Sequence, residues 1–201
     1  MPNWCNNSLK VEGKASELKI FVKKAKGVDT DLSLQKLYPM PKALRDTTSP
    51  VSNKTKAEQE KNAELLKKYG FADWWTWRIS KWGTKWDIEA HLQKIGKTLY
   101  YGFDSAWAPP VNWLEYVCKK FPKLTFTLDY EESGVGFRGQ MICENGEVVS
   151  EEEYDWTGAY CDDCEEAIID DEDLVEADDC YYHKECYKKI KAKAKKKGAK
   201  K

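Results

Sequence analysis

The sequence predicts an α+β protein with a ferredoxin-like β-α-β-β-α-β sheet, an inserted helical region, an extra hairpin and a small C-terminal zinc module. Three observations lead to this fold class. Segments of alternating apolar and polar residues recur along the chain, helical periodicity separates them in the order of that fold, and a Cys/His cluster follows the last of them. The 201 residues suffice for one full domain, expected at residues 1–155, and a small satellite.

A β-α unit is predicted at the start of the chain. NNSLKVEG (residues 6–13) alternates polar and apolar positions and ends at Gly13, as a strand with one buried face does. Ser16 is a suitable N-cap for a helix that ends before Gly27. The apolar residues of this helix recur at helical spacing: Leu18, Phe21, Val22 and Ala25.

Residues 28–83 are expected to be an insertion with a helix and a Trp-rich segment. Residues 28–63 include the Pro, Ser and Thr of an irregular connection, whereas KAEQEKNAELLKKYG (residues 56–70) has the composition of a helix. We expect the five tryptophans that follow to pack in the core, and the alternative is stacking on nucleic-acid bases beside Lys81 and Lys85. The five are Trp74, Trp75, Trp77, Trp82 and Trp86.

The remaining strands and the second helix follow in the order that the fold requires. WDIEAHLQKI (residues 86–95) and KTLYYGFDSAW (residues 97–107) alternate with a period of two and predict a hairpin through Gly96. PPVNWLEYVCKKF (residues 109–121) predicts a helix that opens on two prolines, and LTFTLDYEE (residues 124–132) predicts another strand.

An extra hairpin is expected beyond the basic sheet. GVGFRGQMICENGEVVSEEEY (residues 134–154) contains two alternating runs on either side of Asn145-Gly146. Asn-Gly favours the tight turn of a two-residue hairpin loop, so the sheet should have more than four strands.

Four stretches of this chain resemble the YubB-like family of plasmid and phage proteins. They are MPNWCNNSLKVEG, WGTKWD, FDSAWAPP and YEESGVGFRG, and the similarity covers roughly residues 1–150. The resemblance implies a ferredoxin-like domain and a setting in mobile genetic elements. It brings no catalytic motif to this sequence.

The segment from residue 161 to 186, CDDCEEAIIDDEDLVEADDCYYHKEC, has the spacing of a tetrahedral zinc site. Two thiolates two residues apart, Cys161 and Cys164, bind one ion from a tight knuckle, and a hairpin returns a second pair, His183 and Cys186. This arrangement is similar to the first zinc site of LIM domains and predicts a LIM-like module at residues 156–190. Cys180 is an alternative to Cys186 as the fourth ligand.

Zinc at this site is expected to be structural. Four protein ligands close the tetrahedron and leave no position for an activated water. So few apolar residues cannot hold a fold alone, whereas a structural Zn²⁺ contributes ~10 kcal/mol or more. The alternative is a set of reduced, unliganded cysteines in an acidic tail. A disulfide framework is disfavoured by the odd count of seven cysteines.

Charge is segregated along the chain although its formal net value is only −1. Residues 139–183 contain no Lys or Arg, whereas a Lys-rich tail occupies residues 191–201. The acidic stretch is either a solvated face or a surface that occupies a basic nucleic-acid channel of another protein. The tail is either a solvated terminus or a phosphate-binding segment.

Two further candidate sites carry weaker signals. Asp104 and Trp107 in FDSAWAPP are candidate binding residues at a surface rim, with a turn-stabilising Asp and a wedged Trp as the alternative. His91, with Glu89 as its neighbour on the same face, is a candidate general base, but no Ser or Cys nucleophile accompanies it in a recognisable arrangement. We therefore expect no enzymatic activity.

We expect a non-enzymatic protein-binding protein of a phage or mobile element, which binds a host or element-encoded protein. A counter-defence inhibitor, such as an anti-CRISPR that binds a host nuclease complex, is one example. A nucleic-acid-binding accessory protein that uses the Lys-rich tail is the second expectation. With no run of ~20 apolar residues and no signal peptide, we expect a place in the bacterial cytoplasm and not in a membrane.

Overall fold

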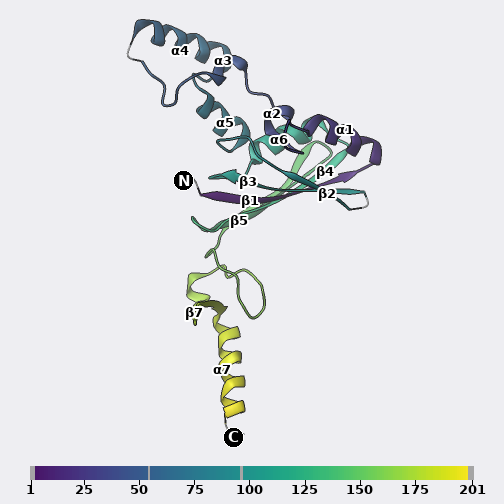
Figure 1. Ribbon diagram of the computed structural model, residues 1–201, viewed down its shortest axis with the longest axis vertical. Helices are drawn as coiled ribbons and strands as arrows, with labels where there is room; N and C mark the ends of the chain where they lie inside the picture. The colour runs from purple at the N-terminus through teal and green to yellow at the C-terminus, as the bar shows by residue number, and fades with distance from the viewer. Residues whose placement is uncertain (1–2, 54, 96, 199–201) are drawn as a thin grey trace. The chain divides into compact units, whose positions relative to one another are not determined.

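The computed structural model describes residues 3–53, 55–95 and 97–198, and the chain divides into two compact units (Figure 1). The first unit runs from the N-terminus to Tyr130 and includes Gln140–Glu152. The second comprises Glu131–Gly139 and the described residues from Glu153 onward. The turn between residues 131 and 139 thus belongs with the C-terminal unit. A single boundary after residue 155, as predicted from the sequence, does not anticipate this.

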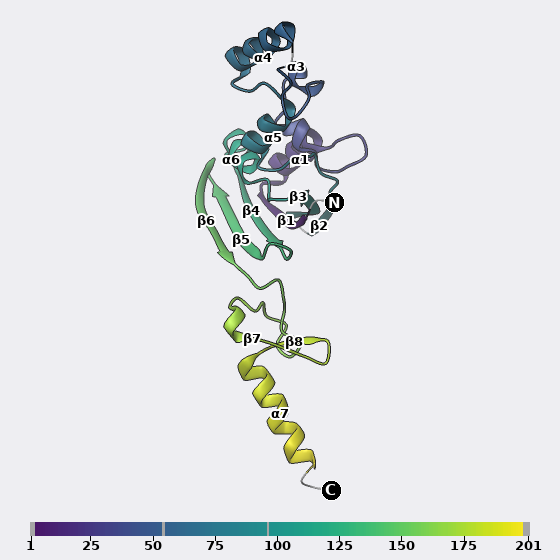
Figure 2. The same cartoon turned by 90° about the vertical axis from the view of Figure 1, so that its left-hand side faces the viewer.

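Six strands of the described chain form one sheet in the order β2-β3-β1-β4-β5-β6 (Figure 2). Their bounds are β1 (Trp4–Gly13), β2 (His91–Ile95), β3 (Thr98–Ala106), β4 (Leu124–Glu132), β5 (Phe137–Glu144) and β6 (Glu147–Asp155). β3 is antiparallel to both β1 and β2, and Trp4 of β1 lies opposite Ala106. The first four strands have the ferredoxin-like order, which confirms the predicted fold class.

The extra hairpin is also confirmed. β5 and β6 extend the sheet beyond β4, and Asn145 and Gly146 between them have φ values of 54° and 84°. Both residues therefore adopt the left-handed conformation that a tight hairpin turn requires.

Two helices, α1 (Ala15–Ala25) and α6 (Val111–Lys120), contribute apolar side chains to the core beside the sheet. Phe21 of α1 makes edge-on ring contacts with Tyr101 and Phe126 of the sheet at centroid distances of 6.1 and 5.6 Å. Alternate residues of β1 are buried, so one face of the strand contributes to the core and the other is exposed.

The predicted N-cap of α1 is wrong. The helix begins at Ala15, and Lys14 precedes it with no side-chain cap, so Ser16 lies inside the first turn. Gly13, which precedes the helix, lies close to β4: a Cβ on Gly13 would be 2.5 Å from a side-chain atom of Leu124.

The insertion holds four helices among its described residues (Figure 1), of which only the one at residues 56–69 was predicted. They are α2 (Leu34–Leu37), α3 (Lys42–Arg45), α4 (Lys56–Tyr69) and α5 (Trp74–Trp82). Indole N–H groups anchor the insertion: Trp82 donates to the carbonyl of Tyr38 at 2.9 Å, and Trp113 of α6 donates to the carbonyl of Leu34 at 3.2 Å.

The prediction of core packing is correct for only part of the tryptophan cluster. Trp77 and Trp82 are buried, Trp74 and Trp86 are half-buried, and Trp75 is exposed. The geometry of α5 explains why Trp75 differs from Trp77: residues two apart lie about 200° apart around a helix, so Trp77 faces the core and Trp75 faces solvent.

The strand predicted at residues 86–95 is shorter in the structure and begins at His91. Asp87 explains the difference, because its carboxylate accepts hydrogen bonds from the Ser33 hydroxyl at 2.7 Å and the Leu34 N–H at 2.6 Å. The Ala90 carbonyl accepts from the Asp31 N–H at 3.1 Å. Residues 87–90 are therefore bonded to the insertion instead of continuing the strand.

The second unit contains a two-stranded sheet, a 3₁₀ turn and a C-terminal helix. They are β7 (Leu174–Ala177), β8 (Cys180–His183), η1 (Asp171–Asp173) and α7 (Lys184–Gly198). Its core is small: Ala159, Cys161 and Ile168 are buried, with Leu174 and Tyr182 among the side chains packed against them. No helix in the described part of the chain combines the length and apolar character that a membrane span needs.

Candidate metal centre and a polar hollow

The first pair of candidate ligands lies on a tight turn. The Cys161 carbonyl accepts a hydrogen bond from the Glu165 N–H at 2.8 Å, which closes the loop around Cys164. Asp162 holds this loop against β8: its N–H donates to the Tyr181 carbonyl at 2.8 Å, and its carboxylate accepts from the Tyr181 N–H at 2.7 Å. The turn is thereby fixed two residues before His183.

The second pair lies where β8 passes into α7. His183 is the last residue of the strand, and Cys186 lies in the first turn of the helix. The Asp173 carboxylate accepts a hydrogen bond from the Lys184 N–H at 3.0 Å, which satisfies one of the free donors at the start of α7. The strand-helix junction thus returns both side chains to the cysteine turn.

The structure brings the four predicted ligands together. The ligand atoms of Cys161, Cys164, His183 and Cys186 all lie within 4.8 Å of one another, and the Cys164 Sγ is 3.4 Å from the His183 Nδ1. With Zn–S bonds of about 2.3 Å, tetrahedral ligand atoms lie roughly 3.8 Å apart. The four side chains therefore fit one tetrahedral metal ion with little rearrangement.

Hydrogen bonding also selects the coordinating nitrogen of His183. Its Nε2 lies 3.3 Å from the carbonyl oxygen of Ala167, which can only accept, so Nε2 carries a proton. Nδ1 then faces Cys164 with its lone pair free. Such a second bond from the imidazole of a metal ligand fixes the tautomer and the ring orientation.

Two thiols of this cluster, Cys161 and Cys186, have shifted pKa values. Burial alone would raise the pKa of Cys161, but hydrogen bonds from the backbone N–H groups of His183, Cys164 and Asp163 outweigh it and lower the pKa to about 6. Burial and the neighbouring thiols raise the pKa of Cys186 to about 12. A divalent cation among these sulfurs would offset the repulsion that raises the pKa of Cys186.

Cys180 is not part of the ligand group that the described residues form. It lies opposite Ala177 at the turn end of the β7–β8 hairpin, where Asp178 and Asp179 have positive φ values of 53° and 60°. Cys180 and His183 lie at opposite ends of the extended strand β8. The geometry therefore does not support the alternative set in which Cys180 replaces Cys186.

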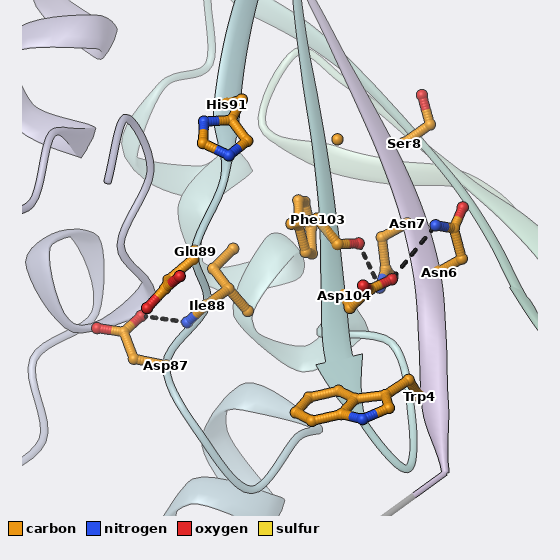
Figure 3. Close-up of a pocket in the computed structure, with 11 residues that line it drawn as sticks. Trp4, Asn6, Asn7, Ser8, Asp87, Ile88, Glu89, His91, Phe103 and Asp104 are labelled. Carbon is orange, nitrogen blue, oxygen red and sulfur yellow. Dashed lines mark hydrogen bonds between the residues drawn. The ribbon is translucent and has the colours of Figure 1, made fainter. Parts of the chain in front are cut away.

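A polar hollow of about 750 Å³ lies on the exposed face of the first unit's sheet, where residues 87–89 separate from β3 (Figure 3). Trp4 lies at one end of the hollow and His91 at the other (Figure 3). Ser8 and His91 flank Gly102 in one row across β1, β3 and β2. No neighbouring atom lies within 4 Å of the position of a Cβ on Gly102, so this glycine leaves the middle of the row open.

Asp104 and Trp107 do not share this hollow. Asp104 lines it and accepts a hydrogen bond from the Asn6 side chain at 3.3 Å (Figure 3). Trp107 is not among the lining residues and is 49% exposed. Its N–H donates to the Asn3 carbonyl at 3.0 Å, and its φ of 72° is unusual for a bulky residue.

His91 and Glu89 both line the hollow, although Glu89 lies outside the strand in which the two were expected to be neighbours. Trp4 and Gly102 were missed as lining residues. The alternation of β1 could have identified Trp4, because Trp4, Asn6 and Ser8 share the exposed face if the strand is extended by two residues.

The comparisons with known proteins concern mainly the sheet. Residues 81–178, just under half of the chain, match the family model described as the ferredoxin-like domain in Api92-like protein. The crystal structure of a protein api92 from Yersinia pseudotuberculosis is similar at 12% sequence identity and a TM-score of 0.49, over 77% of this chain and 98% of that one. No curated protein matches the chain.

The family match ends before His183 and Cys186, so it covers only the first pair of candidate ligands. It supports the ferredoxin-like description of the sheet. The YubB-like resemblance and the LIM-like description of the module stay predictions.

Proposed function

We propose that this chain is a non-enzymatic protein-binding protein in which a zinc-stabilised acidic module docks on a basic surface of a partner. One observation supports this most directly: residues 153–183, all in the second unit, hold 13 carboxylates and no Lys or Arg. Such a surface attracts a basic partner over several ångströms and repels nucleic acid.

The acidic residues are displayed on a framework that the metal would hold together. Asp163, Glu166 and Asp171 are exposed, as is most of the acidic stretch around the ligand cluster. Among the described residues, the buried cluster of Ala159, Cys161 and Ile168 in this unit is small, so packing contributes little to the order of this surface. Structural Zn²⁺ would therefore determine the shape of the acidic face.

The site chemistry favours binding over catalysis. Four protein ligands would saturate a tetrahedral ion, and a saturated ion does not activate water. His91 lines the polar hollow, but its ring is exposed and carboxylates are the only other ionisable side chains that line this hollow. The exposed indoles of Trp4 and Trp107 are side chains typical of protein interfaces.

The partner that best fits this surface is a protein with a basic nucleic-acid channel. The YubB-like resemblance places the chain in phages or plasmids, in the cytoplasm of a bacterial host, where host nuclease complexes have such channels. A counter-defence inhibitor, for example an anti-CRISPR, is therefore the specific form of the proposal.

Affinity capture of the tagged full-length chain from bacterial lysate tests the proposal. We expect one protein to be recovered in stoichiometric amount, with or without nuclease treatment, and to be lost when Cys164→Ser removes a ligand. The matched control is Cys180→Ser, which should retain the partner. Recovered material that disappears after nuclease treatment would contradict protein binding.

The alternative function is nucleic-acid binding through the Lys-rich tail. It is favoured by the helical conformation of α7, which bears Lys184, Lys188, Lys189, Lys191 and Lys193 among its described side chains. Residues 199–201 of the predicted tail lie outside the described residues. Phosphate contacts by lysines would give binding without sequence preference that weakens steeply with salt.

Fluorescence anisotropy with a labelled DNA duplex separates the two functions. Under the alternative, the intact chain binds the duplex, and truncation after Tyr187 abolishes binding. Under the main proposal, the same truncation leaves the captured protein partner bound. A truncated chain that loses the protein partner and retains DNA binding would contradict both.

A further inference from the structure

An apolar groove with a cationic rim lies in the first unit, far in sequence from the acidic module. Its volume is about 280 Å³. The apolar side chains that line it are Ala15, Leu18 and Val22 of α1, Leu92 of β2 and Leu99 of β3. Four exposed lysines complete the lining: Lys19, Lys23, Lys94 and Lys97. No carboxylate is among the lining residues, so the groove combines apolar surface with positive charge only.

The four lysines do not form ion pairs within the described chain. The ion pairs of the described chain involve other lysines. For example, Glu17 of α1 pairs with Lys123, which precedes β4. Four unneutralised ammonium groups around one groove repel one another, and a ligand that brings carboxylates relieves this repulsion. The charge pattern therefore selects an anionic ligand with an apolar part.

The groove also adjoins an outer edge of the sheet, which Asp31 of the insertion occupies at the position of Leu92. β2 is the last strand of the sheet on this side, and the Leu92 N–H bonds to the Asp31 carboxylate at 3.1 Å instead of to β3. Because strand residues alternate, Lys94 directs its N–H and C=O to the same outer edge as Leu92. An extended segment that pairs with the backbone of Lys94 would place every second side chain over the groove.

We propose that this groove binds an extended acidic segment of a partner protein, with one aliphatic side chain inserted between carboxylates. The aliphatic side chain packs against Leu18, Val22 and Leu92. The carboxylates two residues before and after it reach the lysines at the rim. This site is separate from the acidic module and goes beyond the proposed function, because it accepts a partner surface of the opposite charge.

The edge geometry favours a peptide over a fatty acid. A fatty acid would fill the apolar part and present one carboxylate, but it would not use the backbone groups of Lys94 or the separated positions of the lysines on α1 and on the β2–β3 hairpin. A peptide with two carboxylates around one aliphatic residue uses the apolar part of the groove, the backbone groups of Lys94 and the separated lysines.

Chemical-shift titration of the full-length ¹⁵N-labelled protein tests the proposal. The probe is the acetylated, amidated peptide Glu-Ser-Leu-Ser-Glu. Two control peptides separate its features: Glu-Ser-Ser-Ser-Glu lacks the aliphatic side chain, and Lys-Ser-Leu-Ser-Lys reverses the charges. We expect shifts of backbone amides in α1, β2 and β3 with the probe, and at least about tenfold weaker binding of either control.

Charge-reversal variants locate the site. Lys19→Glu combined with Lys94→Glu should weaken binding of the probe about tenfold or more, since two attractive contacts become repulsive. The matched control, Lys61→Glu combined with Lys67→Glu, changes the net charge equally on the exposed helix α4 and should leave binding unchanged. All four lysines are exposed, so the variants are expected to fold.

Three results would overturn the proposal. Equal binding of Glu-Ser-Ser-Ser-Glu would show attraction to lysines without use of the groove. Shifts confined to residues outside α1, β2 and β3 would place the peptide elsewhere. Stronger binding of dodecanoate than of the peptide at the same amides would show that the groove accepts a fatty acid.

Discussion

Asn7 is a buried polar residue in the middle of β1, where the alternation of the strand would place an apolar side chain. Its Nδ2 donates to the Cys5 carbonyl at 2.7 Å and lies 2.9 Å from the Ser105 hydroxyl. Ser105 in turn donates to the Ala108 carbonyl at 2.8 Å. The NNS and FDSAWAPP stretches are therefore joined by one buried hydrogen-bond network.

Replacement of Asn7 by Ala should lower the free energy of unfolding by about 1–3 kcal/mol, because it removes buried hydrogen bonds to the Cys5 carbonyl and the Ser105 hydroxyl. The matched control is Asn6→Ala, next along the same strand but exposed, which should cost less than about 0.5 kcal/mol. Urea denaturation followed by tryptophan fluorescence measures both. If Asn7→Ala and Asn6→Ala lose the same free energy of unfolding, the buried hydrogen bonds of Asn7 do not contribute measurably to stability.

The ligand set gives a second prediction for single residues. Elemental analysis of the purified protein should find about one zinc per chain, which Cys164→Ser or Cys186→Ser removes because three ligands bind far more weakly than four. Cys180→Ser should retain the metal, since Cys180 lies outside the ligand group. Metal loss in the Cys180 variant with retention in the Cys186 variant would reverse the assignment.

Single residues differ in how well the sequence predicts them. The clustering of Cys161, Cys164, His183 and Cys186 could be predicted because they are close in sequence and their spacing reflects local turns. The hollow could not, because Trp4, His91 and Asp104 come from strands whose register depends on the whole sheet.

At the scale of elements, Gly83 ends α5 with a φ of 88° and explains the WGT motif. A Cβ on Gly83 would lie 2.8 Å from the Pro109 carbonyl oxygen, so the backbone before α6 packs directly on this glycine. Gly70 ends α4 in a similar conformation, with φ at 76°, but no atom lies within 4 Å of its Cβ position.

Gly83→Ala should therefore destabilise the protein more than Gly70→Ala does. We expect a loss of about 1 kcal/mol for Gly70→Ala from the left-handed conformation alone, and roughly 2–4 kcal/mol for Gly83→Ala because the backbone must also move. Thermal denaturation compares the two. Similar Tm values for both variants would show that the contact with Pro109 is unimportant.

The elements were predictable where local pattern determined them. Helix α4 and the Asn145-Gly146 turn follow from composition and turn chemistry. β2 was predicted too long because Asp87 and Ala90 bond to residues 31–34, far away in sequence. Such long-range bonds leave no mark in the alternation of a strand.

For the whole molecule, the two units should respond differently to removal of the metal. Chelation should abolish hydrogen-exchange protection of β7 and β8, because the small core around Ile168 cannot hold them. Amides of β1 and β3 should stay protected, since an extensive apolar core lies beneath them. Mass spectrometry of exchange before and after chelation measures both, and unchanged protection of β8 in metal-free protein would contradict a structural role.

β6 is the outer strand of the sheet, and Glu151, Glu152 and Glu153 are exposed along it. An open strand invites pairing with the same strand of another copy, and like charges oppose this self-association. We therefore expect the acidic sequence also to keep separate copies of the protein apart in solution. Because 1 M salt reduces the screening length to about 3 Å, concentrated salt should favour fibril-like aggregation of a protein that stays dispersed in dilute buffer.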